Sequence, residues 1–257
     1  MSNITLPNQK IVTEMISSLF EHLFPITYSY TDSETESIRN DPENQLLGIL
    51  SGLTDNNEEV ARQFFGNLEK IKELLLKDAG FILESDPAAT QLIEVIAIYP
   101  GFFAIFSYRI AHALALLSVP LLPRMITEYA HKVTGIDIHP LASIGNPFSI
   151  DHGTGIVIGE TTLIGNNVKL YQGVTLGALS VDKSKASKKR HPTIQDNVVL
   201  YAGCTILGGE TVIGRNSIIG GNVWLTESIA PFSMVYHKSE IIVRNQSNFQ
   251  EPVNFVI

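Results

Sequence analysis

The feature that most constrains this chain is a six-residue repeat of aliphatic residues, which begins after Gly135. The repeated positions are Ile138, Ile144, Ile150 and Ile156; Ile158, Ile164, Leu170 and Leu176; Ile194, Leu200 and Ile206; and Ile213, Ile219 and Leu225. Neither an α-helix nor an alternating strand has a period of six. A parallel β-helix does, because each hexad is one short strand plus one corner. We therefore predict a β-helix whose aliphatic residues point inward and stack coil on coil, about 4.8 Å apart.

The first half of the chain has a different composition. Residues 1–130 hold 17 acidic against 8 basic residues, whereas the remainder holds 9 against 10, and 14 of the 19 glycines fall after residue 130. Apolar residues at spacings of 3 and 4 predict a helix that opens at Asp55-Asn56 and stops at Gly80. The pair Asp86-Pro87 predicts the N-cap and the first position of a second helix. The expected helices cover 8–24, 42–52, 87–98, 102–117 and 122–134 in addition.

These two patterns predict an α+β chain, with an all-α part followed by a parallel β-helix. The expected division is a helical domain over 1–135, a β-helix domain over 136–238 with an extruded loop at 177–193, and a tail over 239–257. The helical part alone identifies no reaction, and its expected role is that of a cap or assembly domain.

Several functional classes are disfavoured by the same sequence. The apolar stretch Val95–Pro123 is interrupted by Arg109 and by prolines, so we expect a buried helical hairpin and no membrane span. The polar N-terminus lacks a secretory pattern. The single Cys204 excludes an internal disulfide framework and predicts a packed small side chain. We therefore expect a cytoplasmic protein. The acidic first half disfavours nucleic-acid binding.

The repeat is interrupted between Leu176 and Ile194 by a basic insert. This insert contains Lys183, Lys185, Lys188, Lys189 and Arg190 against one acid, Asp182. One interpretation is a solvated surface loop. The favoured one is a loop that covers a site and attracts an anion such as the phosphates of coenzyme A.

Histidines gather in the repeat region, at positions 139, 152, 191 and 237. A neutral imidazole is a suitable general base for a hydroxyl near pH 7, and a carboxylate on its other nitrogen would fix its tautomer. Asp137 and Asp151 are candidates for that carboxylate. Asp137 precedes His152 by 15 residues, close to one 18-residue coil, although each histidine could also be a solvated side chain.

Particular motifs give a more specific resemblance. They are 133–140 (VTGIDIHP), 150–161 (IDHGTGIVIGET), 173–177 (GVTLG), 190–192 (RHP), 86–88 (DPA) and 108–112 (YRIAH). Together they resemble bacterial and plant serine O-acetyltransferase, a family of hexapeptide-repeat acyltransferases, over about residues 84–226. The resemblance implies a left-handed β-helix, assembly as a homotrimer or a dimer of trimers, and active sites between neighbouring subunits.

The resemblance also assigns roles to residues. It implies that His152 removes the serine hydroxyl proton, that Asp137 orients it, and that serine attacks the acetyl-CoA thioester directly. His191 would lie near the hydroxyl. Asp86 and Asp151 would hold the substrate ammonium, and Arg190 its carboxylate. The residues implied for the acetyl-CoA side are Gly177, Ala178, Ala202, Gly203, Gly221 and Lys238, with an oxyanion donor near Gly177. No metal is implied.

Departures from the family pattern lie on the acyl-CoA side. Gly177-Ala178 stands where the family has two glycines, the loop before Arg190 is longer and richer in lysine, and Tyr236–Ser239 replaces a Gly-x-Pro-Ala turn. Acetyl-CoA is the expected donor, with succinyl-CoA as the alternative. The family's terminal isoleucine binds O-acetylserine sulfhydrylase, and Ile257 fits this role. The same family is commonly inhibited by cysteine in the serine pocket.

Two other functions are compatible with the repeat. A zinc lyase of the carbonic anhydrase type would need three converging histidines, for which His139, His152 and His191 could be proposed. Arg190 beside His191 disfavours a cation there. A non-catalytic trimeric scaffold, whose tail binds a partner, is the third interpretation.

Overall fold

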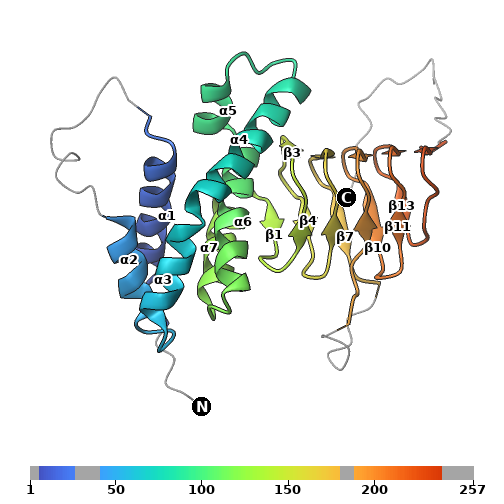
Figure 1. The fold of residues 1–257 in the computed structure, drawn as a ribbon. Coiled ribbons are helices and arrows are strands. Elements are labelled where there is room, and N and C mark those ends of the chain that lie inside the picture. Colours follow the sequence, from blue (N-terminus) through green and yellow to red (C-terminus); the bar gives the residue numbers. More distant parts are fainter. Residues whose placement is uncertain (1–5, 27–40, 180–187, 239–257) are drawn as a thin grey trace, which may run out of the picture.

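The computed structural model describes residues 6–26, 41–179 and 188–238. Within them, helices precede strands along the chain (Figure 1). The helices are α1 (Gln9–Leu23), α2 (Pro42–Leu50), α3 (Asn57–Gly66), α4 (Leu68–Ser85), α5 (Leu92–Ile98), α6 (Pro100–Leu116) and α7 (Leu122–Thr134). Gly135 closes α7 in the left-handed conformation, with φ of 72°, as predicted for its position.

The structure corrects two helix predictions. The helix predicted from Asp55 to Gly80 is two helices, because the chain breaks at Asn67, and α4 continues through Gly80 to Ser85. Asp86 therefore follows the end of α4 and does not begin the next helix, since α5 starts only at Leu92. A Cβ added at Gly80 would meet no atom within 4 Å, so packing does not require glycine there. Glycine costs the helix about 1 kcal/mol of propensity without breaking it.

The repeat forms the predicted coil. Its strands are β1 (Asp137–Ile138), β2 (Ser143–Ile144), β3 (Phe148–Asp151), β4 (Val157–Ile158), β5 (Leu163–Ile164), β6 (Val168–Tyr171), β7 (Thr175–Gly177), β8 (Thr193–Ile194), β9 (Val199–Leu200), β10 (Thr205–Leu207), β11 (Val212–Ile213), β12 (Ile218–Ile219), β13 (Trp224–Leu225) and β14 (Met234–Val235). Every strand pairing is parallel, and from β1 to β13 successive strands belong to successive sheets. This is the left-handed β-helix architecture.

Three sheets form the sides of the coil. Sheet A has the order β1-β4-β7-β10-β13, sheet B the order β11-β8-β5-β2, and sheet C the order β14-β12-β9-β6-β3. The chain turns from sheet A to sheet B at one corner, which we call the A–B corner. It returns from sheet C to sheet A at another, the C–A corner. Sheet A thus lies between these two corners.

Aliphatic residues of the repeat form the interior of the coil. Ile138, Ile158, Leu176 and Ile206 stack in register along sheet A, and each is at most 2% exposed. Cys204 is fully buried, which agrees with its prediction as a packed side chain. Burial raises the pKa of its thiol to about 12.

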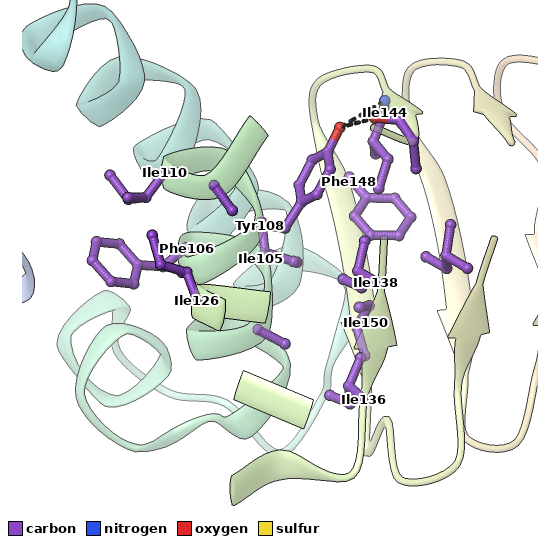
Figure 2. Packing of buried hydrophobic residues seen from close by; sticks show 14 of the residues in the cluster. Ile105, Phe106, Tyr108, Ile110, Ile126, Ile136, Ile138, Ile144, Phe148 and Ile150 are labelled. Carbon is purple, nitrogen blue, oxygen red and sulfur yellow. Dashed lines mark hydrogen bonds between the residues drawn. The ribbon is translucent and has the colours of Figure 1, made fainter. Parts of the chain in front are cut away.

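The helices and the coil share one continuous hydrophobic cluster (Figure 2). Tyr108 of α6 fixes this junction, since its hydroxyl donates to the Ala142 carbonyl at 2.6 Å and accepts the Ile144 N–H at 3.1 Å. Beside it, Arg109 pairs with the fully buried Asp78 of α4 and donates to the Gly145 carbonyl at 3.0 Å. The charge that interrupts the apolar stretch is therefore an internal link between helices and coil.

That apolar stretch forms α5 and α6. Among the described helices, none reaches by itself the length and apolarity that a membrane crossing requires. The two helices reach these limits only as a pair, and a bend of 71° separates them.

Candidate active site

His152 lies at the C–A corner, directly after β3. Its backbone has a φ of 58°, in the left-handed region that is uncommon for residues other than glycine. Its side chain is 72% exposed, and Nε2 lies 3.9 Å from Oδ1 of Asp151. The corner therefore presents this imidazole to solvent beside a carboxylate, and left-handed strain of this kind is frequent at functional sites.

Asp86 faces the same corner from the end of α4. Its carboxylate accepts the Ala88 N–H at 2.8 Å and the Tyr99 hydroxyl at 2.7 Å. These two hydrogen bonds are the main causes that lower the pKa of Asp86, and the charges of Lys169 and His152 contribute further. The same bond to Asp86 raises the pKa of Tyr99 to about 12, so the phenol remains a donor. A fixed anion thus lies near His152.

His191 lies at the other edge of sheet A, at the A–B corner. Its Nδ1 accepts the Thr161 N–H at 3.1 Å and lies 2.9 Å from the Thr161 hydroxyl. Because Nδ1 accepts from a backbone N–H, the proton of the neutral ring is on Nε2. Burial, followed by the charge of Arg190, lowers the pKa of His191 to about 4, so this ring is neutral at pH 7.

Arg190 is oriented by residues of the same corner. Its guanidinium forms an ion pair with Glu160, and its backbone N–H donates to the Thr161 hydroxyl at 2.9 Å. The β4–β5 corner therefore holds both members of the Arg190-His191 pair in place. Neither Glu160 nor Thr161 was singled out from the sequence for this role. Both residues belong to the IGET motif at 158–161, which lies on the coil before the RHP motif at 190–192.

Asp137 begins β1 in sheet A, in register with Val157, and its N–H donates to the Ile156 carbonyl at 2.9 Å. Its carboxylate lies 3.7 Å from Arg124 of α7, and it is among the charges that act on the pKa of His139. Among the described residues, no ion pair joins Asp137 to His152 within one chain. The spacing of 15 residues places them near adjacent coils, as predicted, but it does not bring them into an ion pair within one chain.

The three histidines considered for a zinc site lie at two different corners of the coil. His139 and His191 share the A–B corner, where each is near Glu160 and Arg190. His152 is at the C–A corner. A separate group, Glu128, His131 and Asp137, has ligand atoms within 4.8 Å of one another, but Arg124 pairs with both carboxylates of this group.

The residues assigned to the acyl-CoA side also fall on both corners. Ala202, Gly203 and Gly221 stack at the C–A corner, where the Asn222 N–H donates to the Ala202 carbonyl at 2.9 Å. Gly177 ends β7 and Ala178 follows it toward the A–B corner. Lys238 is exposed beyond β14. Lys183 and Lys185 of the basic insert, Asp182 and the terminal Ile257 lie outside the described residues.

The candidate site residues of one chain therefore lie in two groups, which we call half-sites. Asp86, Asp151 and His152 form the half-site at the C–A corner, and Arg190 and His191 form the half-site at the A–B corner. Asp137 lies on sheet A between these corners. Because sheet A separates the two corners, the two half-sites do not meet within one chain. Tyr99 and Lys169, which contact the first half-site, were not identified from the sequence.

Comparisons with known proteins agree on one family. No family model matches the chain. A plasmid serine acetyltransferase of Synechococcus elongatus is 48% identical over 188 residues, which cover 71% of this chain but only 59% of that protein. The serine acetyltransferase of Bacillus subtilis is 42% identical over 182 residues, which cover 70% of this chain and 82% of that protein.

Solved structures agree with these relatives. Serine acetyltransferase isoform 3 of Entamoeba histolytica, in complex with cysteine, has a TM-score of 0.73 and 37% identity, over 90% of this chain and 84% of that one. The serine acetyltransferase of Neisseria gonorrhoeae in complex with serine has a TM-score of 0.63 and 27% identity, over 91% of this chain and 96% of that one. A serine acetyltransferase in complex with CoA has a TM-score of 0.62 and 25% identity, over 88% and 94%.

A left-handed β-helix of six-residue repeats, with an exposed histidine and carboxylates at one corner, defines an acyltransferase of the hexapeptide-repeat class. Within this class, the relatives and the solved structures are all named for transfer to serine. The chain belongs to the serine acetyltransferase family. It is accordingly an enzyme that transfers an acyl group and uses acetyl-CoA as co-substrate.

Proposed function

We propose that His152 is the general base that removes the hydroxyl proton of L-serine. The observation that supports this role is an exposed imidazole held 3.9 Å from Asp151, with the anionic Asp86 nearby. The serine oxygen attacks the thioester carbonyl of acetyl-CoA, and a tetrahedral oxyanion forms. When the carbon–sulfur bond breaks, the coenzyme A sulfur takes the proton that His152 removed, and O-acetylserine is released.

The substrate's other groups are assigned to the remaining charges. Asp86 and Asp151 hold the serine ammonium. Arg190 holds its carboxylate, for which the planar guanidinium suits two-point contact. Glu160 keeps Arg190 oriented until serine arrives. His191, neutral and carrying its proton on Nε2, donates toward the serine hydroxyl.

We propose that a complete site forms between two subunits of a homotrimer, or of a dimer of such trimers. The C–A corner of one subunit then faces the A–B corner of its neighbour, which brings His152 to Asp137, Arg190 and His191 of another copy. The separation of His152 from Arg190 and His191, which lie at different corners of one chain, supports this assembly. In a cyclic trimer each interface is equivalent, so three sites result.

Coenzyme A is proposed to lie along the same interface. Gly177 and Ala178 would line it from one subunit, with a backbone N–H near Gly177 facing the oxyanion. Ala202, Gly203, Gly221 and Lys238 would line it from the other. Small residues at these corners leave room for the pantetheine arm, and lysines of the insert would attract its phosphates.

The experiment that tests the reaction is serine-dependent release of free thiol from acetyl-CoA by the purified chain. Replacing His152 with Ala should lower kcat by about 10²–10⁴-fold, because the general base is lost. His22→Ala, an exposed histidine of α1, is the matched control and should retain wild-type turnover. Near-normal turnover of His152→Ala would overturn the proposal. The same assay with succinyl-CoA tests the donor.

We also propose that the C-terminal Ile257 binds O-acetylserine sulfhydrylase, in keeping with the family resemblance. Removing the last residues should abolish that binding while acyl transfer persists. A truncated chain that still binds the sulfhydrylase with unchanged affinity would contradict this partner.

A further inference from the structure

Lys169 of β6 is a buried lysine that the reaction described above does not use. Its side chain is 11% exposed, which is rare for lysine unless its charge is compensated. The next residue, Leu170, is fully buried in the coil, whereas Lys169 reaches toward the end of α4. Its neighbour two residues along the strand, Tyr171, projects on the same side, and the Lys169 ammonium lies 4.8 Å from the centre of that ring.

The ammonium of Lys169 connects three elements. It donates to the Ser85 carbonyl, the last residue of α4, at 2.9 Å. It lies 3.7 Å from Oδ2 of Asp151, whose other oxygen faces His152 at 3.9 Å. The next residue after Ser85 is Asp86, and the charge of Lys169 is one of the influences on that carboxylate. Lys169 therefore touches both segments that carry the ammonium-binding carboxylates.

We propose that Lys169 is a positioning residue for the substrate ammonium. It ties the C-terminus of α4 to β3 through Asp151, and so sets the separation between Asp86 and Asp151. The inference rests on the proposed function, because it takes these two carboxylates as the ammonium site. The charges of Asp86, Asp151 and Lys169 sum to −1, and the single ammonium of serine would neutralise this charge.

The expected effect is on serine binding and not on chemistry. Lys169→Met keeps the length and the packing against the Tyr171 ring but removes the donor and the charge. We expect the KM for serine to rise about 10-fold, the loss of one charge-assisted hydrogen bond, with kcat and the KM for acetyl-CoA within about 2-fold of wild type. Lys169→Arg, which can still donate to the Ser85 carbonyl, should recover at least part of the serine KM.

The matched control is Lys77→Met, which removes an exposed lysine from α4, the helix that Lys169 contacts, and should leave all three constants unchanged. Lys169→Gln, an uncharged donor, provides a second variant if Lys169→Met does not fold, and its serine KM should lie between those of wild type and Lys169→Met. A wild-type serine KM in the uncharged variants, or equal increases in both KM values, would overturn the positioning role.

A parallel variant separates this inference from the proposed function. Asp151→Asn should itself raise the serine KM if Asp151 binds the ammonium. A raised KM in Asp151→Asn with an unchanged KM in Lys169→Met would refute Lys169 alone. An unchanged KM in Asp151→Asn would instead refute the ammonium site on which both rest.

Discussion

At the scale of single residues, the position of His191 depends on a glycine one coil below it. A Cβ added to Gly159 would lie 2.0 Å from Cδ2 of His191, so any larger residue would displace the ring. Thr161 fixes the opposite edge of the ring through Nδ1. The IGET motif thus determines the orientation of a histidine 30 positions further along the chain.

The buried, neutral state of His191 predicts a pH dependence of stability. The pKa of this ring is about 4 in the folded chain and about 6.5 when unfolded. Between these values the unfolded state binds more protons, so stability is fully present above pH 6.5 and falls as the pH falls toward 4. We expect the thermal midpoint of His191→Gln to fall less over this range than that of wild type.

His22→Gln serves as the control for this measurement, because His22 is exposed on α1. Its midpoint should follow the wild-type pH profile. A His191→Gln profile that is parallel to wild type would show that the ring does not contribute to the acid sensitivity.

At the scale of elements, the junction between α4, α6 and the first coil depends on one buried carboxylate. Asp78 accepts hydrogen bonds from Arg109, from the Asn146 side chain at 2.7 Å and from the Phe148 N–H at 2.8 Å. Burial raises the pKa of Asp78, and these donors oppose that rise. Since α4 ends at Ser85, directly before Asp86, this junction also sets where the end of the helix places Asp86.

Arg109→Met should destabilise the chain by about 3–5 kcal/mol, because it leaves the Asp78 charge buried without its cation. Urea unfolding monitored by circular dichroism gives this value. The double variant Asp78→Asn with Arg109→Met removes both charges and keeps an oxygen acceptor for Phe148, so it should cost less than Arg109→Met alone. A double variant that is less stable than the single one would contradict this explanation.

At the scale of the whole molecule, the two half-sites predict complementation between inactive subunits. His152→Ala damages only the half-site at the C–A corner, and Arg190→Ala only the half-site at the A–B corner. In a trimer assembled at random from equal amounts of both, about one interface in four joins two intact halves. Co-expressed subunits should therefore recover about a quarter of wild-type turnover.

Each variant expressed alone provides the baseline, which should be near zero in thiol release. Mixed assemblies that remain as inactive as the separate variants would show that one subunit contains the whole site. Separate oligomers mixed after purification, without exchange of subunits, should also remain inactive.

The sequence alone determined the coil, the class and the family. A β-helix has a one-dimensional core, in which each inward residue contacts its equivalents one coil away. Ile138, Ile158 and Leu176 therefore reveal their stacking through spacing alone. The end of α7 was predictable for a similar reason, because Gly135 is a local signal. The motifs around His152 and His191 were sufficient to predict the family.

The tertiary structure alone decided how the site is divided and what supports it. Asp86 has the local pattern of an N-cap, yet it follows α4, because packing of the helix against β3 extends it past Gly80. Lys169 contacts both Ser85 and Asp151. The contact with Ser85 joins positions more than 80 residues apart, and no local sequence pattern encodes such a contact. Asp137 and His152 are 15 residues apart, but Asp137 lies on sheet A and His152 at the corner after β3, and no ion pair joins them among the described residues. Local periodicity fixes a coil, whereas contacts between coils and helices fix which side chains meet.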